Sequence, residues 1–334
     1  MTSPRIADYF DIKHRFLRST YLERDFADPS ALQGYILTEQ NRQNLQRMVE
    51  GLTESSKQRS WRITGDYGSG KSSFGLMLAH VFAGNTEALP APLQQAMSFD
   101  SSKTPSLLPV LVTGSREPLS AALLRSLYEA IRETCDRGRP PSVLNRLQAQ
   151  LENPSHLEDG DKAALDLLGE ATTYIKESGK KSGILIILDE LGKFLEFAAL
   201  HPERQDIYFL QKLAEIADRS NKAPLFVVGL LHQGFNAYAD RLSQPMQKEW
   251  EKVAGRYQEV LFNQPLEESV RLVAEALGIR DEALPNKLVQ QAQNALRESV
   301  ALGWYGAAAS APRLAEQASK TYPLHPTITT RSSS

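Results

Sequence analysis

A glycine-rich segment between a strand pattern and a helix pattern constrains this chain more than any other feature. Residues 65–72 read GDYGSGKS, which matches the pattern G-x-x-x-x-G-K-[ST]. A short strand pattern, residues 61–64, precedes it, and a helix pattern follows from Ser72 to Phe82. This order of elements is typical of a phosphate-binding loop. The bare pattern arises by chance on the order of once per hundred chains of this length.

The residues of this loop have separate expected roles. Glycines allow successive backbone N–H groups to turn toward phosphate oxygens, and the helix N-terminus adds its positive end. Lys71 is expected to reach the β and γ phosphates of ATP, and the Ser72 hydroxyl to hold Mg²⁺. The predicted nucleotide-binding residues are Gly65, Asp66, Tyr67, Gly68, Ser69, Gly70, Lys71, Ser72 and Ser73.

A second motif closes the most apolar stretch of the sequence. Residues 184–188 read ILIIL, a run that is apolar on both faces and therefore predicts a central parallel strand covered on both sides. Asp189 and Glu190 follow at once. Beside a phosphate loop, Asp189 is predicted to hold Mg²⁺ and Glu190 to orient the attacking water. Taken alone, the pair could equally be a solvated turn.

Five strand patterns alternate with helix patterns along the chain, near Trp61, Val110, Ile184, Leu225 and Tyr257. This alternation predicts βαβ units and a doubly wound parallel sheet of the α/β class. After Pro265 the pattern is helical only. The predicted domains are an N-terminal helical extension (1–55), a sheet domain (56–264) with an insertion at about 137–161, and a small all-helical subdomain (265–334).

Composition limits the classes of partner and compartment. The chain has 38 Lys and Arg against 40 Asp and Glu, a net charge of −2, so no whole-chain field attracts nucleic acid or a membrane. The single cysteine, Cys135, fits a reducing compartment. The N-terminus lacks an apolar signal core, and the longest apolar run is far below the roughly 20 residues of a membrane helix. We therefore expect a cytoplasmic protein.

The phosphate loop and the Asp189-Glu190 pair resemble those of the additional-strand, catalytic-glutamate class of P-loop ATPases, which includes the AAA+ and STAND groups. The resemblance implies a P-loop NTPase fold whose strands, numbered along the chain from the loop strand, have the spatial order 5-1-4-3-2. It also implies that the helices after Pro265 form a lid. An oligomer is expected, because many AAA+ proteins assemble into one.

The resemblance also assigns sensor residues. In this class a polar side chain after the fourth strand contacts the γ-phosphate or the water, and His232 and Gln233 stand at that position. A histidine there can also be purely structural. Arg256, with Arg241 as second choice, matches the arginine that completes a neighbouring subunit's site; a solvated arginine is the alternative. Arg313 occupies the place of the lid arginine.

Four stretches resemble the N-terminal ATPase module of large bacterial ATP-binding proteins of antiphage-defence (BREX-like) and other DNA-linked systems. They are GDYGSGKSSF (65–74), LDELGKFLE (188–196), LHQ (231–233) and YPLHPT (322–327). In such proteins much more chain follows the last stretch, so this sequence is expected to be a truncated form or an excised module.

Two classes of function remain open at this point. In the first, an oligomeric ATPase works within a DNA-linked or defence complex with protein partners, and double-stranded DNA binds only to the assembled form. In the second, nucleotide binding is a STAND-like switch that recruits a protein effector, and slow hydrolysis resets it. A kinase is a third class, but no substrate-binding motif supports it. The small basic clusters, such as Lys180-Lys181, lack the interleaved aromatics of a single-strand binding surface.

Overall fold

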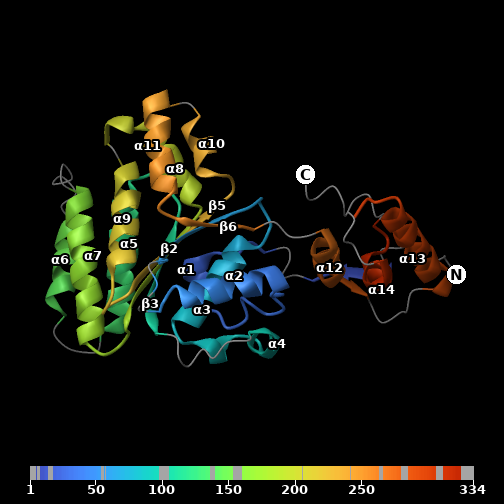
Figure 1. The fold of residues 1–334 in the computed structure, drawn as a ribbon. Helices are drawn as coiled ribbons and strands as arrows, with labels where there is room; N and C mark the ends of the chain where they lie inside the picture. Colours follow the sequence, from blue (N-terminus) through green and yellow to red (C-terminus); the bar gives the residue numbers. More distant parts are fainter. Residues whose placement is uncertain are drawn as a thin grey trace. The chain divides into compact units, whose positions relative to one another are not determined.

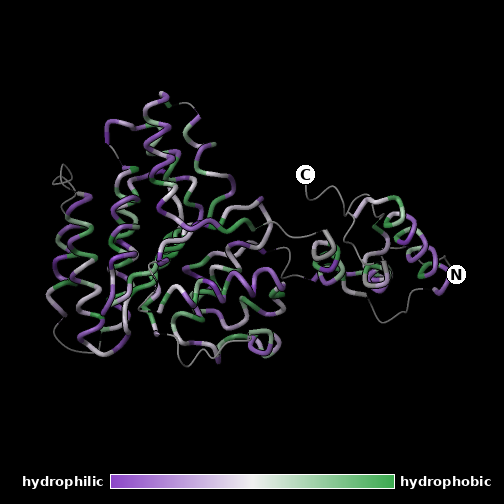
Figure 2. Tube along the Cα trace, viewed as in Figure 1, coloured by the Kyte–Doolittle hydropathy of each residue, from purple (hydrophilic) through white to green (hydrophobic). Residues whose placement is uncertain are grey.

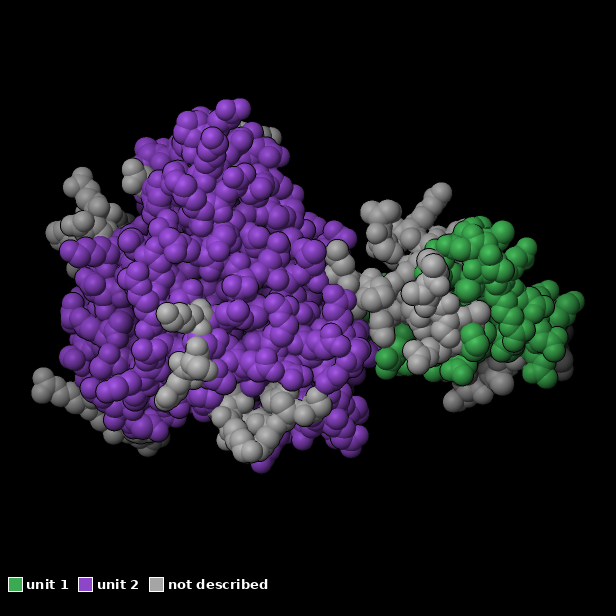
Figure 3. Space-filling model, viewed as in Figure 1, with its two compact units in different colours: residues 1–19, 263–334 green, residues 20–262 purple. Residues whose placement is uncertain are grey.

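A computed structural model of the chain divides into two compact units. The larger unit is Thr20–Phe262, and the smaller combines Met1–Ser19 with Asn263–Ser334 (Figure 3). The structure describes residues 5, 8–13, 18–53, 56, 58–97, 105–135, 140–152, 160–204, 206–240, 242–262, 266–279, 285–305 and 311–324.

The larger unit is built around a five-stranded parallel sheet with the order β3-β4-β5-β2-β6. Its strands are β2 (Ser60–Thr64), β3 (Leu107–Thr113), β4 (Gly183–Asp189), β5 (Leu225–Leu231) and β6 (Gln258–Leu261). Numbered from the loop strand, this is the order 5-1-4-3-2. The predicted fold class and strand order are confirmed.

The neighbouring strands β4 and β5 are buried along their whole length. Along β4 the side chains alternate between two hydrophobic clusters: Ile184, Ile186 and Leu188 belong to one, and Leu185 and Ile187 to the other. The uninterrupted apolar run therefore has a simple cause, because each face of the strand is covered. Figure 2 shows these hydrophobic strands between helices that carry hydrophilic residues.

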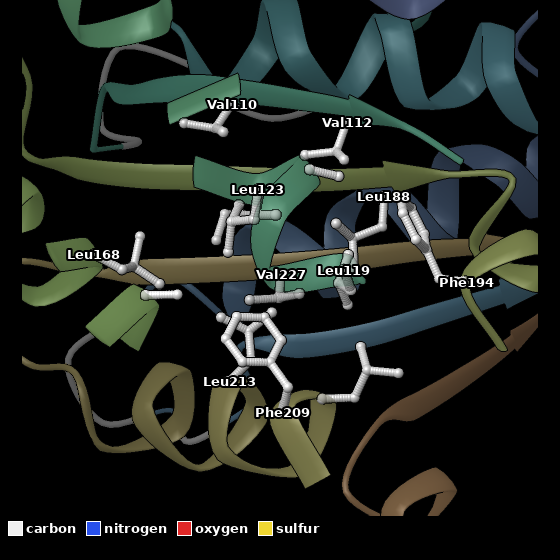
Figure 4. Packing of buried hydrophobic residues seen from close by; sticks show 14 of the residues in the cluster. Val110, Val112, Leu119, Leu123, Leu168, Leu188, Phe194, Phe209, Leu213 and Val227 are labelled. Carbon is white, nitrogen blue, oxygen red and sulfur yellow. The ribbon is translucent and has the colours of Figure 1, made fainter. Parts of the chain in front are cut away.

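Helices pack on both faces of the sheet (Figure 1). One face contacts α5 (Leu119–Thr134), α7 (Gly160–Glu177), α8 (Leu191–Leu200) and α9 (Ile207–Arg219). Figure 4 shows this packing, with Leu123 and Phe209 from helices and Val110 and Val227 from strands in the same cluster. The other face contacts α1 (Leu22–Asp25) and α3 (Lys71–Phe82), and α2 (Glu39–Glu50) contributes to the same hydrophobic cluster as α3.

Residues 20–53 pack with the sheet rather than forming a separate extension. Leu22, Leu45 and Met48 are fully buried in the cluster that contains Phe74 of α3. The compact larger unit therefore begins near Thr20, whereas the sequence pattern placed the start of the sheet domain at residue 56. The reason is that α1 and α2 cover one face of the sheet, which their local pattern does not reveal.

Shorter elements complete the larger unit. They are the 3₁₀ turns Thr86–Ala88 and Pro202–Arg204 and the helices α4 (Ala91–Ala96), α6 (Ser142–Glu152), α10 (Phe235–Ala239) and α11 (Gln244–Ala254). Helix α6 lies in the predicted insertion and buries Val143, Leu144 and Leu147 in the same cluster as α5 and α7. Residues 136–139 and 153–159 of that region lie outside the described part of the chain.

The smaller unit contains three helices and a short antiparallel strand pair within its described residues. The helices are α12 (Leu266–Ala276), α13 (Asn286–Ala301) and α14 (Ala311–Thr321), and the strands are β1 (Phe10–Ile12) and β7 (Leu277–Ile279). The sequence predicts an all-helical subdomain, and the structure adds this strand pair to it. The sequence does not predict this pair, because each strand has only three residues and its partner is remote in the sequence.

None of the described helices is long and apolar enough to cross a membrane.

The buried histidine of α3 gives the larger unit a predicted dependence of stability on pH. His80 is 6% exposed and lies against Phe26, with ring centroids 4.6 Å apart. Burial lowers its pKa below the ordinary 6.5, so the folded state holds the neutral ring. Below pH 6.5 the unfolded chain binds a proton that the folded chain does not, and the free energy of unfolding falls by at most about 1.4 kcal/mol per pH unit.

Urea unfolding, followed by tryptophan fluorescence at several pH values from neutral to acidic, measures this effect. The buried side chains of Trp61 and Trp250 provide the signal. We expect His80→Leu to lose less stability on acidification than the wild type. An equal loss in both proteins would show that His80 is not the source.

Candidate functional site

The phosphate loop connects the end of β2 to the start of α3, as the sequence predicts. Gly68 and Gly70 have φ angles of 75° and 90°, a backbone conformation that side-chain-bearing residues rarely adopt. A Cβ atom at either position would meet no atom within 4 Å, so glycine is required here by conformation and not by space. The first-turn N–H groups of α3, on Lys71, Ser72 and Ser73, have no acceptor within the helix.

Lys71 is held by the loop that it belongs to. Its Nζ donates to the carbonyl oxygens of Gly65 at 2.5 Å and Asp66 at 2.6 Å, and lies 3.3 Å from Ser69 Oγ. The side chain is 5% exposed, and burial lowers its pKa from the ordinary 10.5, while Asp189 and Asp66 oppose that shift. The ammonium is therefore fixed at the base of the loop.

Ser72 and Asp189 bring the two sequence motifs into contact. Ser72 Oγ donates to Asp189 Oδ1 at 3.2 Å, and the Glu190 N–H donates to the same oxygen at 2.9 Å. Asp189 is 6% exposed, and burial raises the pKa of its carboxyl group against the effect of these two hydrogen bonds. A hydroxyl and a carboxylate are hard oxygen ligands that suit Mg²⁺.

A magnesium ion bound in this way needs few protein ligands. The described residues contain no group of three or more His, Cys, Asp or Glu side chains that could hold a metal ion by themselves. Mg²⁺ usually keeps several waters and binds through one or two carboxylates and the phosphates of its substrate. The pair Ser72 and Asp189 fits that mode of binding.

Glu190 has a left-handed backbone conformation with φ of 49°, unlike every other non-glycine residue in the described part of the chain. It precedes α8, and its carboxylate forms an ion pair with Lys193 in the first turn of that helix. Gly114, after β3, donates its N–H to the Asp189 carbonyl at 2.8 Å. Local strain of this kind persists only where the surroundings hold it.

The two predicted sensor residues follow β5, next to the start of the loop. The Gly65 N–H donates to the carbonyl of Leu231, the last residue of that strand, at 3.1 Å. The His232 ring stacks on Tyr67 with centroids 3.5 Å apart and 20° between the planes. Its buried Nδ1 has no hydrogen-bond partner among the described residues, and Gln233 is exposed. Of the two, His232 is the one that contacts the loop.

The pKa of His232 is lowered mainly by burial, and Lys71 and Lys193 lower it further while Glu190 raises it. Three charged side chains thus act on one imidazole. Tyr238 of α10 interacts electrostatically with the same turn: burial raises its pKa to about 12, and the backbone N–H groups of His232 and Gln233 oppose that shift.

Arg256 lies at the opposite end of the sheet from the phosphate loop. It precedes β6, whose first residue pairs with Trp61 in β2, whereas the loop follows the carboxyl end of β2. The length of β6, about 10 Å, separates the two ends. The half-exposed Arg256 is 3.7 Å from Glu215 of α9, so it does not belong to the site of its own chain. Arg241 and the side chain of Arg313 lie outside the described residues.

Four residues at the site were not identified from the sequence. Thr20 Oγ1 lies 2.9 Å from Ser73 Oγ, and Gly114, Lys193 and Tyr238 contact the turns described above. Only Lys193 had a usable signal, because it stands three residues after Glu190, one helical turn along. The other three residues are brought to the site by tertiary packing, which the local sequence does not show.

Comparison with known proteins adds little. No protein-family model matches the chain, and no curated protein matches its sequence. Solved structures that resemble it include the ORC2 protein of Aeropyrum pernix in ADPNP-ADP complexes, at 13% identity and a TM-score of 0.49 over 94% of this chain and 74% of that chain. The ADP form of the same protein gives 13% identity and 0.48 over 93% and 73%. At this level the likeness carries no inference about activity.

The chain itself shows its fold class. A parallel sheet of the predicted order, a glycine-rich loop between β2 and α3, and an acidic pair after β4 together make a P-loop NTPase fold. The site residues Lys71, Ser72, Asp189, Glu190 and His232 all lie at the carboxyl ends of the strands, where ligands bind in open α/β sheets.

Gly114 offers a test of how the Glu190 turn is held. A Cβ atom on Gly114 would lie 2.2 Å from the carbonyl oxygen of Glu190, so the backbone would have to move. We expect Gly114→Ala to cost about 1–3 kcal/mol in the free energy of unfolding, as overpacking does. Urea unfolding measures this cost.

Gly169 is the matched control, because it is exposed on α7 and a Cβ atom there meets nothing within 4 Å. Gly169→Ala should stabilise the helix by about 0.5–1 kcal/mol. Equal stability of the Gly114→Ala variant and the wild type would contradict the close contact.

Proposed function

We propose that this protein binds ATP with Mg²⁺ and hydrolyses it. The single observation that carries the proposal is the contact between Ser72 Oγ and Asp189 Oδ1 at 3.2 Å. It joins the phosphate loop to the acidic strand end, and these are the two parts that phosphoryl-transfer enzymes need side by side.

Each residue of the site has a role in this proposal. The loop from Gly65 to Ser73 presents backbone N–H groups to the phosphates, and Lys71 provides a fixed positive charge at its base. Ser72 and Asp189 would hold Mg²⁺, which when bound supplies positive charge to the phosphate oxygens. Because electrostatic stabilisation dominates phosphoryl transfer, preorganised charges at this position matter more than covalent chemistry.

Glu190 is the proposed residue that orients water and accepts its proton. It follows the buried strand β4 directly, and its side chain is one-third exposed, so water reaches it. His232, with Gln233 as the alternative, is proposed to respond to the terminal phosphate. The support is that His232 contacts Tyr67 of the loop and is sensitive to the charges of Lys71 and Glu190.

Two substitutions separate binding from hydrolysis. Lys71→Ala should weaken nucleotide binding, because it removes the fixed ammonium at the base of the loop. Glu190→Gln should keep nucleotide binding and reduce kcat by about 10²–10⁴-fold, since an amide preserves shape but accepts no proton. Binding is measured by calorimetry and turnover by phosphate release.

The exposed residues Lys212 and Glu203 provide controls on the same chain. Lys212→Ala and Glu203→Gln should behave as the wild type in both assays. Wild-type turnover by the Glu190→Gln variant would refute the assignment of Glu190.

For the biological setting we propose an oligomeric component of a bacterial DNA-linked or antiphage-defence complex. The support is Arg256, which is half-exposed, lies at the other end of the sheet from its own loop, and is 3.7 Å from Glu215. Such a guanidinium is free to neutralise phosphate charge in a neighbouring copy. The alternative is a nucleotide switch that recruits a protein effector and hydrolyses slowly.

The basic pair Lys180-Lys181 forms hydrogen bonds within its own chain. Lys181 Nζ donates to the Ala83 carbonyl at 2.6 Å and to Ser106 Oγ at 2.9 Å, and Lys180 Nζ donates to the Thr134 carbonyl. Both side chains therefore tie loops of the sheet domain together. If double-stranded DNA binds, we propose that it binds the assembled form, through a few phosphate contacts from each subunit.

A protein-concentration series distinguishes the two settings. If Arg256 acts in a neighbouring subunit, turnover per subunit should rise with concentration in the wild type and stay low in Arg256→Ala, while the exposed Arg219→Ala in α9 behaves as the wild type. Slow turnover that is independent of concentration, and equal in all three proteins, would support the switch.

A further inference from the structure

Lys193 is a charged residue at the site to which the proposed function gives no role. It stands in the first turn of α8, and its ammonium forms an ion pair with the Glu190 carboxylate. Its side chain is 49% exposed. It is therefore both in contact with the proposed catalytic carboxylate and accessible from the solvent side.

Helix stability does not explain a lysine at this position. The N-terminus of a helix carries a partial positive charge, so a cation in the first turn is unfavourable and an acidic residue is preferred. An exposed ion pair at spacing i,i+3 stabilises a helix only slightly. A residue that goes against the charge preference of a helix N-terminus, with no evident gain in stability, is typical of functional positions.

The surroundings of Lys193 point to the space in front of the phosphate loop. Its ammonium interacts electrostatically with Glu190, Tyr67 and Asp189, which together raise its pKa above the ordinary 10.5. His232 in turn is affected by Lys71, Glu190 and Lys193. These groups come from the loop, the end of β4, the start of α8 and the end of β5, which all lie at the carboxyl ends of the strands; the contacts among them are the Lys193–Glu190 ion pair and the stack of Tyr67 on His232.

The two lysines approach this region from different sides. Lys71 is tied to the Gly65 and Asp66 carbonyls at the base of the loop, where it is expected to reach the β-phosphate that ATP and ADP share as well as the γ-phosphate. Lys193 lies beside Glu190, which in the proposed mechanism faces the water that attacks the terminal phosphate. A cation at that position interacts with a phosphate that ATP has and ADP lacks.

We propose that Lys193 binds the terminal phosphate and makes the site prefer ATP over ADP, an inference that rests on the proposed ATP-binding function. On ATP binding its ammonium exchanges the Glu190 carboxylate for the terminal phosphate, and Glu190 becomes available to water. Within one chain, the residue thus links recognition of ATP to release of the catalytic carboxylate.

The test measures binding, not turnover. In the Glu190→Gln background hydrolysis is slow and the ion pair is absent, so Lys193 can act on the nucleotide only directly. We expect adding Lys193→Met to this background to weaken ATP binding by about ten-fold, the lower range for a charge-assisted hydrogen bond at a half-exposed site, and to leave ADP binding unchanged. Calorimetric titration with Mg-ATP and with Mg-ADP gives both constants.

Two controls complete the test. In the same Glu190→Gln background, Lys193→Arg should retain the preference for ATP, because it keeps the positive charge. Lys212→Met should leave the preference unchanged. An unchanged ratio of ATP to ADP affinity in Lys193→Met would overturn this inference and leave the proposed function standing. Failure of the Glu190→Gln protein to bind either nucleotide would overturn both.

Discussion

The hydrogen bond between Ser72 and Asp189 is the interaction on which the site depends. The two residues are remote in sequence, and they meet because β2, β5 and β4 run parallel in adjacent positions, with Thr64 opposite Leu231 and Leu188 opposite Gly229. That register aligns the carboxyl ends of the strands. A slip of one residue would turn the side chains of a strand to the other face, and the side chains of β4 pack in two separate hydrophobic clusters, one on each face. The core therefore positions the polar site.

The turn at Glu190 shows how the fold holds a strained residue at the candidate site. Its left-handed backbone costs of order 1–3 kcal/mol. Two hydrogen bonds offset this cost: the Asp189 carboxylate accepts the Glu190 N–H, and Lys193 donates its N–H to the Glu190 carbonyl at 3.0 Å. Gly114 leaves room for that carbonyl. Burial of Asp189 disfavours the charged form of its carboxyl group, because it raises the pKa, whereas the hydrogen bond from the Glu190 N–H lowers it. A divalent cation at Ser72 and Asp189 would favour the ionised form.

The sequence predicted those parts of the structure that depend on local pattern. The loop at 65–72, the buried run before Asp189 and the helix after the loop each leave a periodic or compositional signal within about ten residues, and the strand order followed from the resemblance. The strand pair β1–β7 left no such signal, because its two strands lie at opposite ends of the chain. The same applies to the contact of Thr20 with Ser73 and to the packing of α1 and α2 on the sheet, because a local helix pattern does not show which surface the helix covers.

Two cations with different origins offer two ways of controlling this site. Lys193 belongs to the same chain as the carboxylate that it contacts, so any control that it exerts needs no partner. Arg256 lies at the other end of the sheet and can reach a phosphate loop only in a neighbouring copy. A site completed from within its own chain responds to the nucleotide alone, as a switch does. A site completed from outside responds to assembly. In the proposed mechanism the chain uses both cations: the ATP-bound state forms in one subunit, and the rate of hydrolysis is set by the next.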